Sequence, residues 1–151
     1  GDADIYHDNI AFAVDQCRNR PVSVLVEAIN STTVPGYFMD TLDKLLTLAS
    51  ATPDLQVLVD TFHMRMTGID PAEAIQRASG RIGHVHIADH PGRGQPATGT
   101  IDFPSVLKAL QRVGYGGAIG FEYVPTGADH LGWMQSFATS PNSTLTERPM
   151  Q

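Results

Sequence analysis

The sequence predicts an α/β protein built on a parallel β-sheet, and two features support this fold class. Short apolar runs alternate with longer amphipathic segments along most of the chain. Side chains that can bind metals follow these runs at spacings of 33, 26 and 36 residues, which leaves room for one helix and two loops. Such alternation is typical of parallel strands that are joined by helical crossovers.

Strands and helices can be assigned from this pattern. Strands are expected over residues 22–27, 55–60, 81–89 and 118–123, where the short apolar runs occur. Helices are expected over residues 5–18, 37–51, 70–80, 103–113 and 129–137, which place apolar residues on one side. The helix start at residue 70 is well marked, because Asp70 is a typical N-cap and Pro71 suits the first helical position.

Composition and charge limit the possible functions. The 151 residues suit one domain, and 42% of them are hydrophobic, which is enough for a core. A net charge of −6 without a cluster of lysine or arginine predicts no nucleic-acid partner. No apolar run approaches the ~18 residues of a membrane span, and the single cysteine, Cys17, suits a reducing cytoplasm. We assign residues 1–138 to the folded domain and the polar residues 139–151 to a disordered tail.

Each of the four strand-like runs leads into a side chain that can bind a metal. These side chains are Glu27, Asp60, His86 and Glu122. Because the C-terminal ends of parallel strands meet at one edge of a sheet, we expect the four to converge there. Three carboxylates and one imidazole suit Mn²⁺ or Mg²⁺. The sequence therefore predicts a metal-dependent enzyme that acts on a small oxygenated substrate.

Two further side chains are candidates for contacts with a substrate. His63 lies three residues after Asp60, where we expect a loop to turn both side chains into one pocket. Arg93 lies in a glycine-rich loop, and its guanidinium could hold a substrate carboxylate with two hydrogen bonds. His84 shares a strand face with His86, and we expect it to be an interior histidine rather than a ligand.

The number of strands leaves two architectures open. A complete eight-stranded βα barrel needs about 250 residues, and this chain has room for four of the eight units. A small open sheet would also fit the length, but no glycine-rich phosphate loop follows the first strand. Half a barrel would expose its edge strands and inner sheet face, so we expect self-association or a missing N-terminal half as partner.

Several motifs of the chain match one family in order and spacing. They are Leu25-Val-Glu-Ala-Ile-Asn30, Val59-Asp-Thr-Phe-His63, Gly83-His-Val-His-Ile-Ala-Asp89, Pro91-Gly-Arg93 and Gly120-Phe-Glu-Tyr123. Together they resemble the hydroxypyruvate isomerase-like branch of the xylose isomerase-like TIM barrels. The resemblance runs from about residue 5 to residue 133 and implies a TIM-barrel-type fold, of which this chain forms the C-terminal half with four βα units.

The resemblance also implies a chemistry. The four strand-end residues would bind a divalent metal, which would be Mn²⁺, Mg²⁺ or also Co²⁺. Glu27 and Glu122 would in addition move the proton on the carbon next to a carbonyl, while the metal would hold the oxygens of the enediolate. His63 and Arg93 would contact the keto acid or sugar. The implied reaction is aldose–ketose isomerisation or epimerisation of hydroxypyruvate or a small ketose.

Two departures from the family pattern leave the substrate open. Hydroxypyruvate isomerases commonly have Gln where His86 stands, whereas ketose epimerases have His, and the family tends to have Glu in place of Thr100. Three other classes compete with an active isomerase: a catalytically inactive half-barrel fragment, an apurinic-site endonuclease-like metal hydrolase, and an α/β module that binds a small anion. The net charge of −6 argues against the endonuclease.

Overall fold

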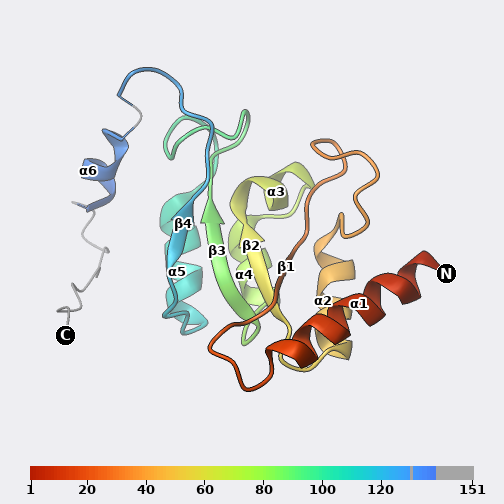
Figure 1. Ribbon diagram of the computed structural model, residues 1–151. Helices are drawn as coiled ribbons and strands as arrows, with labels where there is room; N and C mark the ends of the chain where they lie inside the picture. The colour runs from red at the N-terminus through yellow and green to blue at the C-terminus, as the bar shows by residue number, and fades with distance from the viewer. Residues whose placement is uncertain (130, 139–151) are drawn as a thin grey trace.

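The computed structural model describes residues 1–129 and 131–138, so the tail predicted for residues 139–151 lies outside the described residues. Within this part of the chain, each strand is followed by one or two helices (Figure 1). The helices are α1 (Asp2–Cys17), α2 (Leu42–Ala51), α3 (Thr61–Met66), α4 (Pro71–Arg77), α5 (Phe103–Arg112) and α6 (Trp133–Ala138). The strands are β1 (Leu25–Glu27), β2 (Gln56–Asp60), β3 (Ile82–Ile87) and β4 (Ile119–Phe121). Among these described residues, no helix combines the length and the apolar character that a bilayer crossing requires.

The four strands found in the described residues form one parallel sheet in the order β1-β2-β3-β4, as the sequence predicts. The register places Asp60 opposite His86 and His86 opposite Gly120. Because every strand runs in the same direction, their C-terminal ends lie at the same edge, which is the upper edge in Figure 1. The polar residue that follows each apolar run is therefore brought to this edge.

The core lies between the sheet and the helices α2, α4 and α5, which cover one of its faces (Figure 1). The strands contribute side chains with no solvent exposure to this face, namely Val57, Val59, Val85 and Ile87. The helices contribute Leu45, Ile75 and Val106, each at most 1% exposed. The alternate strand residues, which point to the other face, are less buried, and Leu25 at the edge of the sheet is 40% exposed. One sheet face is thus packed and the other is accessible.

The predicted helix over residues 37–51 is shorter in the structure, because α2 begins at Leu42. The buried Met39 is held at the end of β1, where its carbonyl accepts a hydrogen bond from Ile29 N at 3.0 Å. This tie prevents a helix from starting earlier. Thr41 then caps α2, and its hydroxyl accepts a hydrogen bond from the N–H of Lys44 at 3.3 Å.

Helix α3 was not predicted, since the residues after Asp60 were expected to form a loop. The side chain of Asp60 acts as the N-cap and accepts a hydrogen bond from the backbone N–H of His63 at 3.0 Å. Thr61 fixes the start of the helix, because its hydroxyl donates to the carbonyl of Ala88 at 2.8 Å and accepts from the N–H of Ala88 at 3.0 Å. The ends of β2 and β3 are therefore bound to each other through this threonine.

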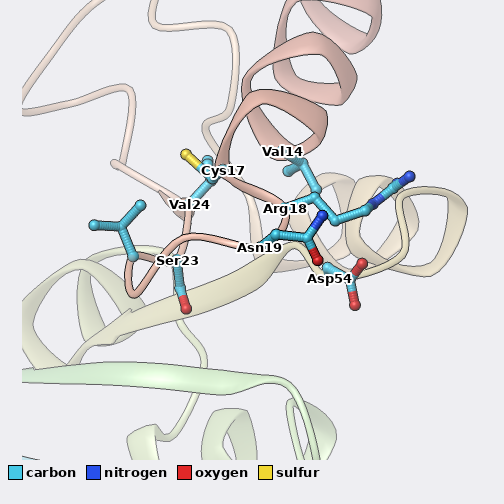
Figure 2. A pocket seen from close by; sticks show the side chains of 8 residues that line it. Val14, Cys17, Arg18, Asn19, Ser23, Val24 and Asp54 are labelled. Atoms are coloured by element: carbon cyan, nitrogen blue, oxygen red, sulfur yellow. The ribbon is translucent and has the colours of Figure 1, made fainter.

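A cavity of about 270 Å³ lies at the opposite end of the sheet, between the end of α1 and the segment that leads into β1 (Figure 2). It is lined by Val14, Cys17, Arg18, Asn19, Val22, Ser23, Val24 and Asp54. None of the residues predicted for the site lines this cavity.

Candidate metal centre

The structure places the predicted site residues at the C-terminal edge of the sheet. Among the described residues, two groups have ligand atoms that all lie within 4.8 Å of one another. One group consists of Glu27, Asp60 and His63, and the other consists of Asp60, His86 and Glu122. Asp60, which is fully buried at the end of β2, belongs to both groups. The four residues predicted as ligands thus form two overlapping groups around Asp60, rather than a single group of four.

Glu27 is a largely buried carboxylate that has an unused oxygen. Among the described residues, its Oε1 atom forms no hydrogen bond, and it lies 3.8 Å from Nε2 of His63. Burial raises the pKa of Glu27 to about 7, with further contributions from the charges of Asp60 and Glu122, while Arg93 acts in the opposite direction. A carboxyl group in this state can hold or release a proton near neutral pH.

His63 is oriented by Asn30, a residue that the sequence analysis did not assign to the site. Nδ2 of Asn30 lies 2.6 Å from Nδ1 of His63, and Oδ1 of Asn30 accepts a hydrogen bond from the N–H of Thr33 at 2.8 Å. The second bond fixes the amide, so Nδ1 of His63 accepts a hydrogen bond and the ring proton lies on Nε2. Burial lowers the pKa of His63, which favours the neutral ring.

This tautomer decides what His63 can do. Its Nε2–H points toward Glu27, and an imidazole nitrogen that carries a proton cannot bind a metal. His63 is therefore suited to donate a hydrogen bond through Nε2, although its distance from Glu27 and Asp60 alone would suit a metal ligand. The substrate-contact role that the sequence predicts for His63 stays a prediction.

His86 and Glu122 face each other at the ends of β3 and β4. Nδ1 of His86 lies 2.9 Å from Oε2 of Glu122, but the two atoms are not aligned as a hydrogen bond, and Nδ1 has no other such partner among the described residues. Gly120 makes room for this arrangement, because an added Cβ would lie 2.8 Å from Cδ2 of His86 and 2.9 Å from Nε2 of His84. Any larger residue at position 120 would push both imidazoles away.

Arg93 lies across the second group of ligands. Its Nη2 atom donates to Oδ2 of Asp60 at 3.1 Å and to Oε2 of Glu122 at 2.9 Å. The guanidinium also lies 5.5 Å from the centre of the Phe62 ring, which is within the range of a cation–π interaction. One positive charge is therefore shared between two of the carboxylates that were predicted to bind a metal.

The loop that carries Arg93 is held in place by a buried aspartate. Asp89 is fully buried, and its carboxylate accepts three backbone hydrogen bonds of 2.8 to 3.0 Å. The donors are the N–H groups of His90, Gly99 and Ile101. The carbonyl of Arg93 also accepts a hydrogen bond from Val124 N at 2.7 Å, beyond the end of β4. These bonds direct the arginine toward the strand ends.

The chemistry of these donors fits a divalent metal. Carboxylate oxygens together with one imidazole are the ligands that Mn²⁺ and Mg²⁺ accept. Two buried atoms of the predicted ligands, Oε1 of Glu27 and Nδ1 of His86, have no hydrogen-bond partner among the described residues. A buried polar atom without a partner is costly, and a cation bound in either group would give one of these atoms a partner.

Comparison with known proteins places this arrangement in a family. The chain is 34% identical over 132 residues to a 2-oxo-tetronate isomerase of Pectobacterium atrosepticum, a match that covers 85% of this chain and 50% of the relative. It is also 28% identical over 134 residues to the hydroxypyruvate isomerase of Escherichia coli. This match covers 86% of this chain and 52% of the relative. The chain thus spans about half the length of the curated relatives that it matches.

A similar structure extends the comparison to the fold. The crystal structure of an AP endonuclease of family 2 from Brucella melitensis matches with a TM-score of 0.81 and 30% sequence identity, covering 87% of this chain and 53% of that one. The family described as xylose isomerase-like TIM barrel matches residues 2–140. The fold class predicted from the sequence is confirmed, and the chain belongs to the xylose isomerase-like TIM barrel family.

Proposed function

We propose that this chain provides the metal-binding and proton-transferring residues of an isomerase for a small keto acid or sugar. The observation that carries the proposal is the pair of carboxylates, Glu27 and Glu122, placed on either side of the buried Asp60 within ligand distance of it. The relatives named 2-oxo-tetronate isomerase and hydroxypyruvate isomerase support this class of substrate. Their substrates carry a hydroxyl group and a carbonyl group on adjacent carbons, which is the arrangement that proton transfer can isomerise.

Each residue has a role that follows from its surroundings. Glu27 would take a proton from carbon and return it; in the metal-free chain, burial raises the pKa of its carboxyl group to about 7. Glu122 is more exposed and would move the second proton from the other side. His63 would donate its Nε2–H to a substrate oxygen, and Arg93 would bind the carboxylate or a hydroxyl group of the substrate.

The metal belongs to the same proposal. Glu27, Asp60, His86 and Glu122 would hold Mn²⁺, Mg²⁺ or Co²⁺, and such an ion polarises a carbonyl and so acidifies the adjacent C–H bond. The donor set supports a hard or borderline divalent ion over a thiophilic one, because no thiol lies among these residues.

Isotope exchange tests the proposed reaction. The chain should be joined to, or mixed with, the N-terminal half of a relative, because the chain spans about half of the relatives' length. In D₂O with Mn²⁺, hydroxypyruvate or a small ketose should gain deuterium at the carbon that bears the hydroxyl group. Glu27→Gln should abolish this gain, while Glu73→Gln on the exposed side of α4 should not. The chain alone should be at least ~100-fold slower, since substrate positioning is worth that much.

The isomerase proposal would be contradicted if the metal-loaded full barrel gave no deuterium exchange. This applies if every three- to six-carbon keto acid and keto sugar tested keeps its protons. The catalytically inactive half-barrel is then the favoured alternative. If Mn²⁺ also fails to bind, a module that holds a small anion at this edge becomes the better interpretation.

An activity on abasic DNA is a second candidate, favoured by the name of the Brucella melitensis structure. The net charge of −6 disfavours it, because a DNA-binding face requires a positive potential. Incubation with a duplex that contains one abasic site tests this directly. We expect no strand cleavage in the presence of Mn²⁺ or Zn²⁺, and metal-dependent nicking at the abasic site would replace the isomerase proposal.

A further inference from the structure

We propose that Arg93 occupies the cation position of the metal centre when no metal is bound, and that a divalent ion must displace it. This inference rests on the proposed metal site and adds a second role to an arginine that was assigned only to the substrate. Arg93 would then act as a competitor of the metal in the free chain.

The first argument is the identity of the contacted atoms. Nη2 of Arg93 donates to Oδ2 of Asp60 at 3.1 Å and to Oε2 of Glu122 at 2.9 Å. These two residues, with His86, form one of the groups whose ligand atoms lie within 4.8 Å of one another. The guanidinium and a metal would therefore use the same carboxylates, and both cations cannot hold the same oxygen lone pairs at once.

The second argument is that Arg93 is incompletely satisfied in this position. Its Nε–H is buried and has no hydrogen-bond partner among the described residues, so the guanidinium uses only part of its five donors there. The residue also has a φ of +57°, a backbone conformation that is uncommon for residues other than glycine. A guanidinium that keeps one buried donor unpaired in this position can yield its place to a divalent ion.

The third argument is the demand for positive charge at this point. Asp60 is fully buried and ionised carboxylates are costly in such a position unless they are paired. Its Oδ1 atom accepts the backbone N–H of His63, and its Oδ2 atom receives the charge of Arg93. Without a metal, Arg93 supplies a permanent positive charge to this carboxylate. A bound metal would supply that charge instead.

The displaced guanidinium would then be free for a substrate. The loop that bears Arg93 is held by Asp89 through backbone bonds, so a change of the side-chain torsions is enough to move the charge. Metal binding and exposure of the anion-binding arginine are thereby linked. The order of events would be metal first and the carboxylate or hydroxyl group of the substrate second.

Metal titration of Arg93→Gln tests the proposal without any measurement of activity. The variant removes the charge but keeps a polar side chain of similar length, and Arg65→Gln on the exposed side of α3 removes the same charge outside the site. By calorimetry, Mn²⁺ should bind Arg93→Gln at least roughly 10-fold more tightly than the wild type, the expected scale for releasing two charge-assisted hydrogen bonds. Arg65→Gln should bind within about 2-fold of the wild type, because exposed charges are screened.

Thermal unfolding gives a second readout that separates competition from a structural role. In EDTA, Arg93→Gln should melt at a lower temperature than the wild type, because Asp60 loses its cation. In saturating Mn²⁺, this difference should vanish. An equal loss of melting temperature in EDTA and Mn²⁺ would show that Arg93 is only structural and would overturn the proposal.

The outcomes also separate this proposal from the metal site itself. Equal Mn²⁺ affinity of wild type and Arg93→Gln, with weaker binding by Glu122→Gln, would leave the metal site standing and refute the competition. Absence of Mn²⁺ binding in the wild type and in Arg93→Gln would refute both. Tight binding by Arg93→Gln together with weak binding by the wild type would support both.

Discussion

Replacing Glu27 with Gln should stabilise the metal-free chain, and the gain should depend on pH. The carboxyl group of Glu27 has a pKa of about 7 in the folded chain, against an ordinary value of 4.5. Below pH 4.5 the group is protonated in both the folded and the unfolded state and costs nothing. Between pH 4.5 and 7 the unfolded chain ionises while the folded chain keeps its proton, so stability falls as the pH rises.

The size of this loss follows from the two pKa values. A gap from 4.5 to about 7 corresponds to about 3 kcal/mol, at about 1.4 kcal/mol for each pH unit. The Glu27 side chain is 20% exposed, and solvent screening reduces the expected cost to about 2–3 kcal/mol. Glu27→Gln removes the titrating group and should therefore raise the free energy of unfolding by this amount above pH 7.

Urea unfolding in EDTA at pH 4.5 and pH 8 measures the effect. The difference between Glu27→Gln and the wild type should be close to zero at the lower pH and about 2–3 kcal/mol at the higher one, which corresponds to a rise in Tm of roughly 5–10 °C. Glu73→Gln, an exposed substitution of the same kind, should show no such dependence. A stability difference that does not change with pH, or a less stable Glu27→Gln at pH 8, would refute the reasoning.

Further predictions concern the metal, the glycine and the asparagine. Glu122→Gln should weaken Mn²⁺ binding by at least ~10-fold in calorimetry, because one charged ligand is lost; unchanged affinity would remove Glu122 from the site. Gly120→Ala should also weaken Mn²⁺ binding while the far-ultraviolet dichroism stays unchanged, because its Cβ would meet Cδ2 of His86 at 2.8 Å. Asn30→Ala should free Nδ1 of His63 and alter the ring nitrogen resonances of that residue by NMR; unaltered resonances would contradict the assigned tautomer. Among the described residues, β1 and β4 leave open sheet edges. The chain should therefore sediment as dimers or larger species, or else unfold as a monomer in a broad transition at low temperature. A monomer with a sharp thermal transition would contradict this expectation.

Much of the fold can be predicted because its determinants are local. Strand ends are marked where an apolar run stops at a polar residue, and the N-cap of α4 is marked by Asp70 followed by Pro71. The alternation of these elements then fixes a parallel sheet, and the sheet brings the residues at its C-terminal edge together. The convergence of Glu27, Asp60 and Glu122 follows from this logic alone.

The remaining features depend on contacts between distant residues. Helix α3 arises because the side chain of Asp60 caps it, and the six residues that follow have no clear helical periodicity in the sequence. The contact between Asn30 and His63 joins residues that are 33 positions apart. The place of Arg93 is determined by a loop that is wound around the buried Asp89. Such contacts appear only after the chain is folded.

The carboxylates at the sheet edge form a site that a bound cation would stabilise. Glu27, Asp60 and Glu122 carry up to three negative charges, and Arg93 supplies a single positive charge to two of them. Without a metal, burial first and the charges of Asp60 and Glu122 second raise the pKa of Glu27 to about 7, so this carboxyl group keeps part of its proton at neutral pH. A divalent ion would provide the charge that is otherwise drawn from this proton and from the guanidinium. Metal binding would then free the carboxylate of Glu27 to act as a base and the guanidinium of Arg93 to bind an anion. The repulsion that destabilises the metal-free chain would in this way favour the state that can bind a substrate.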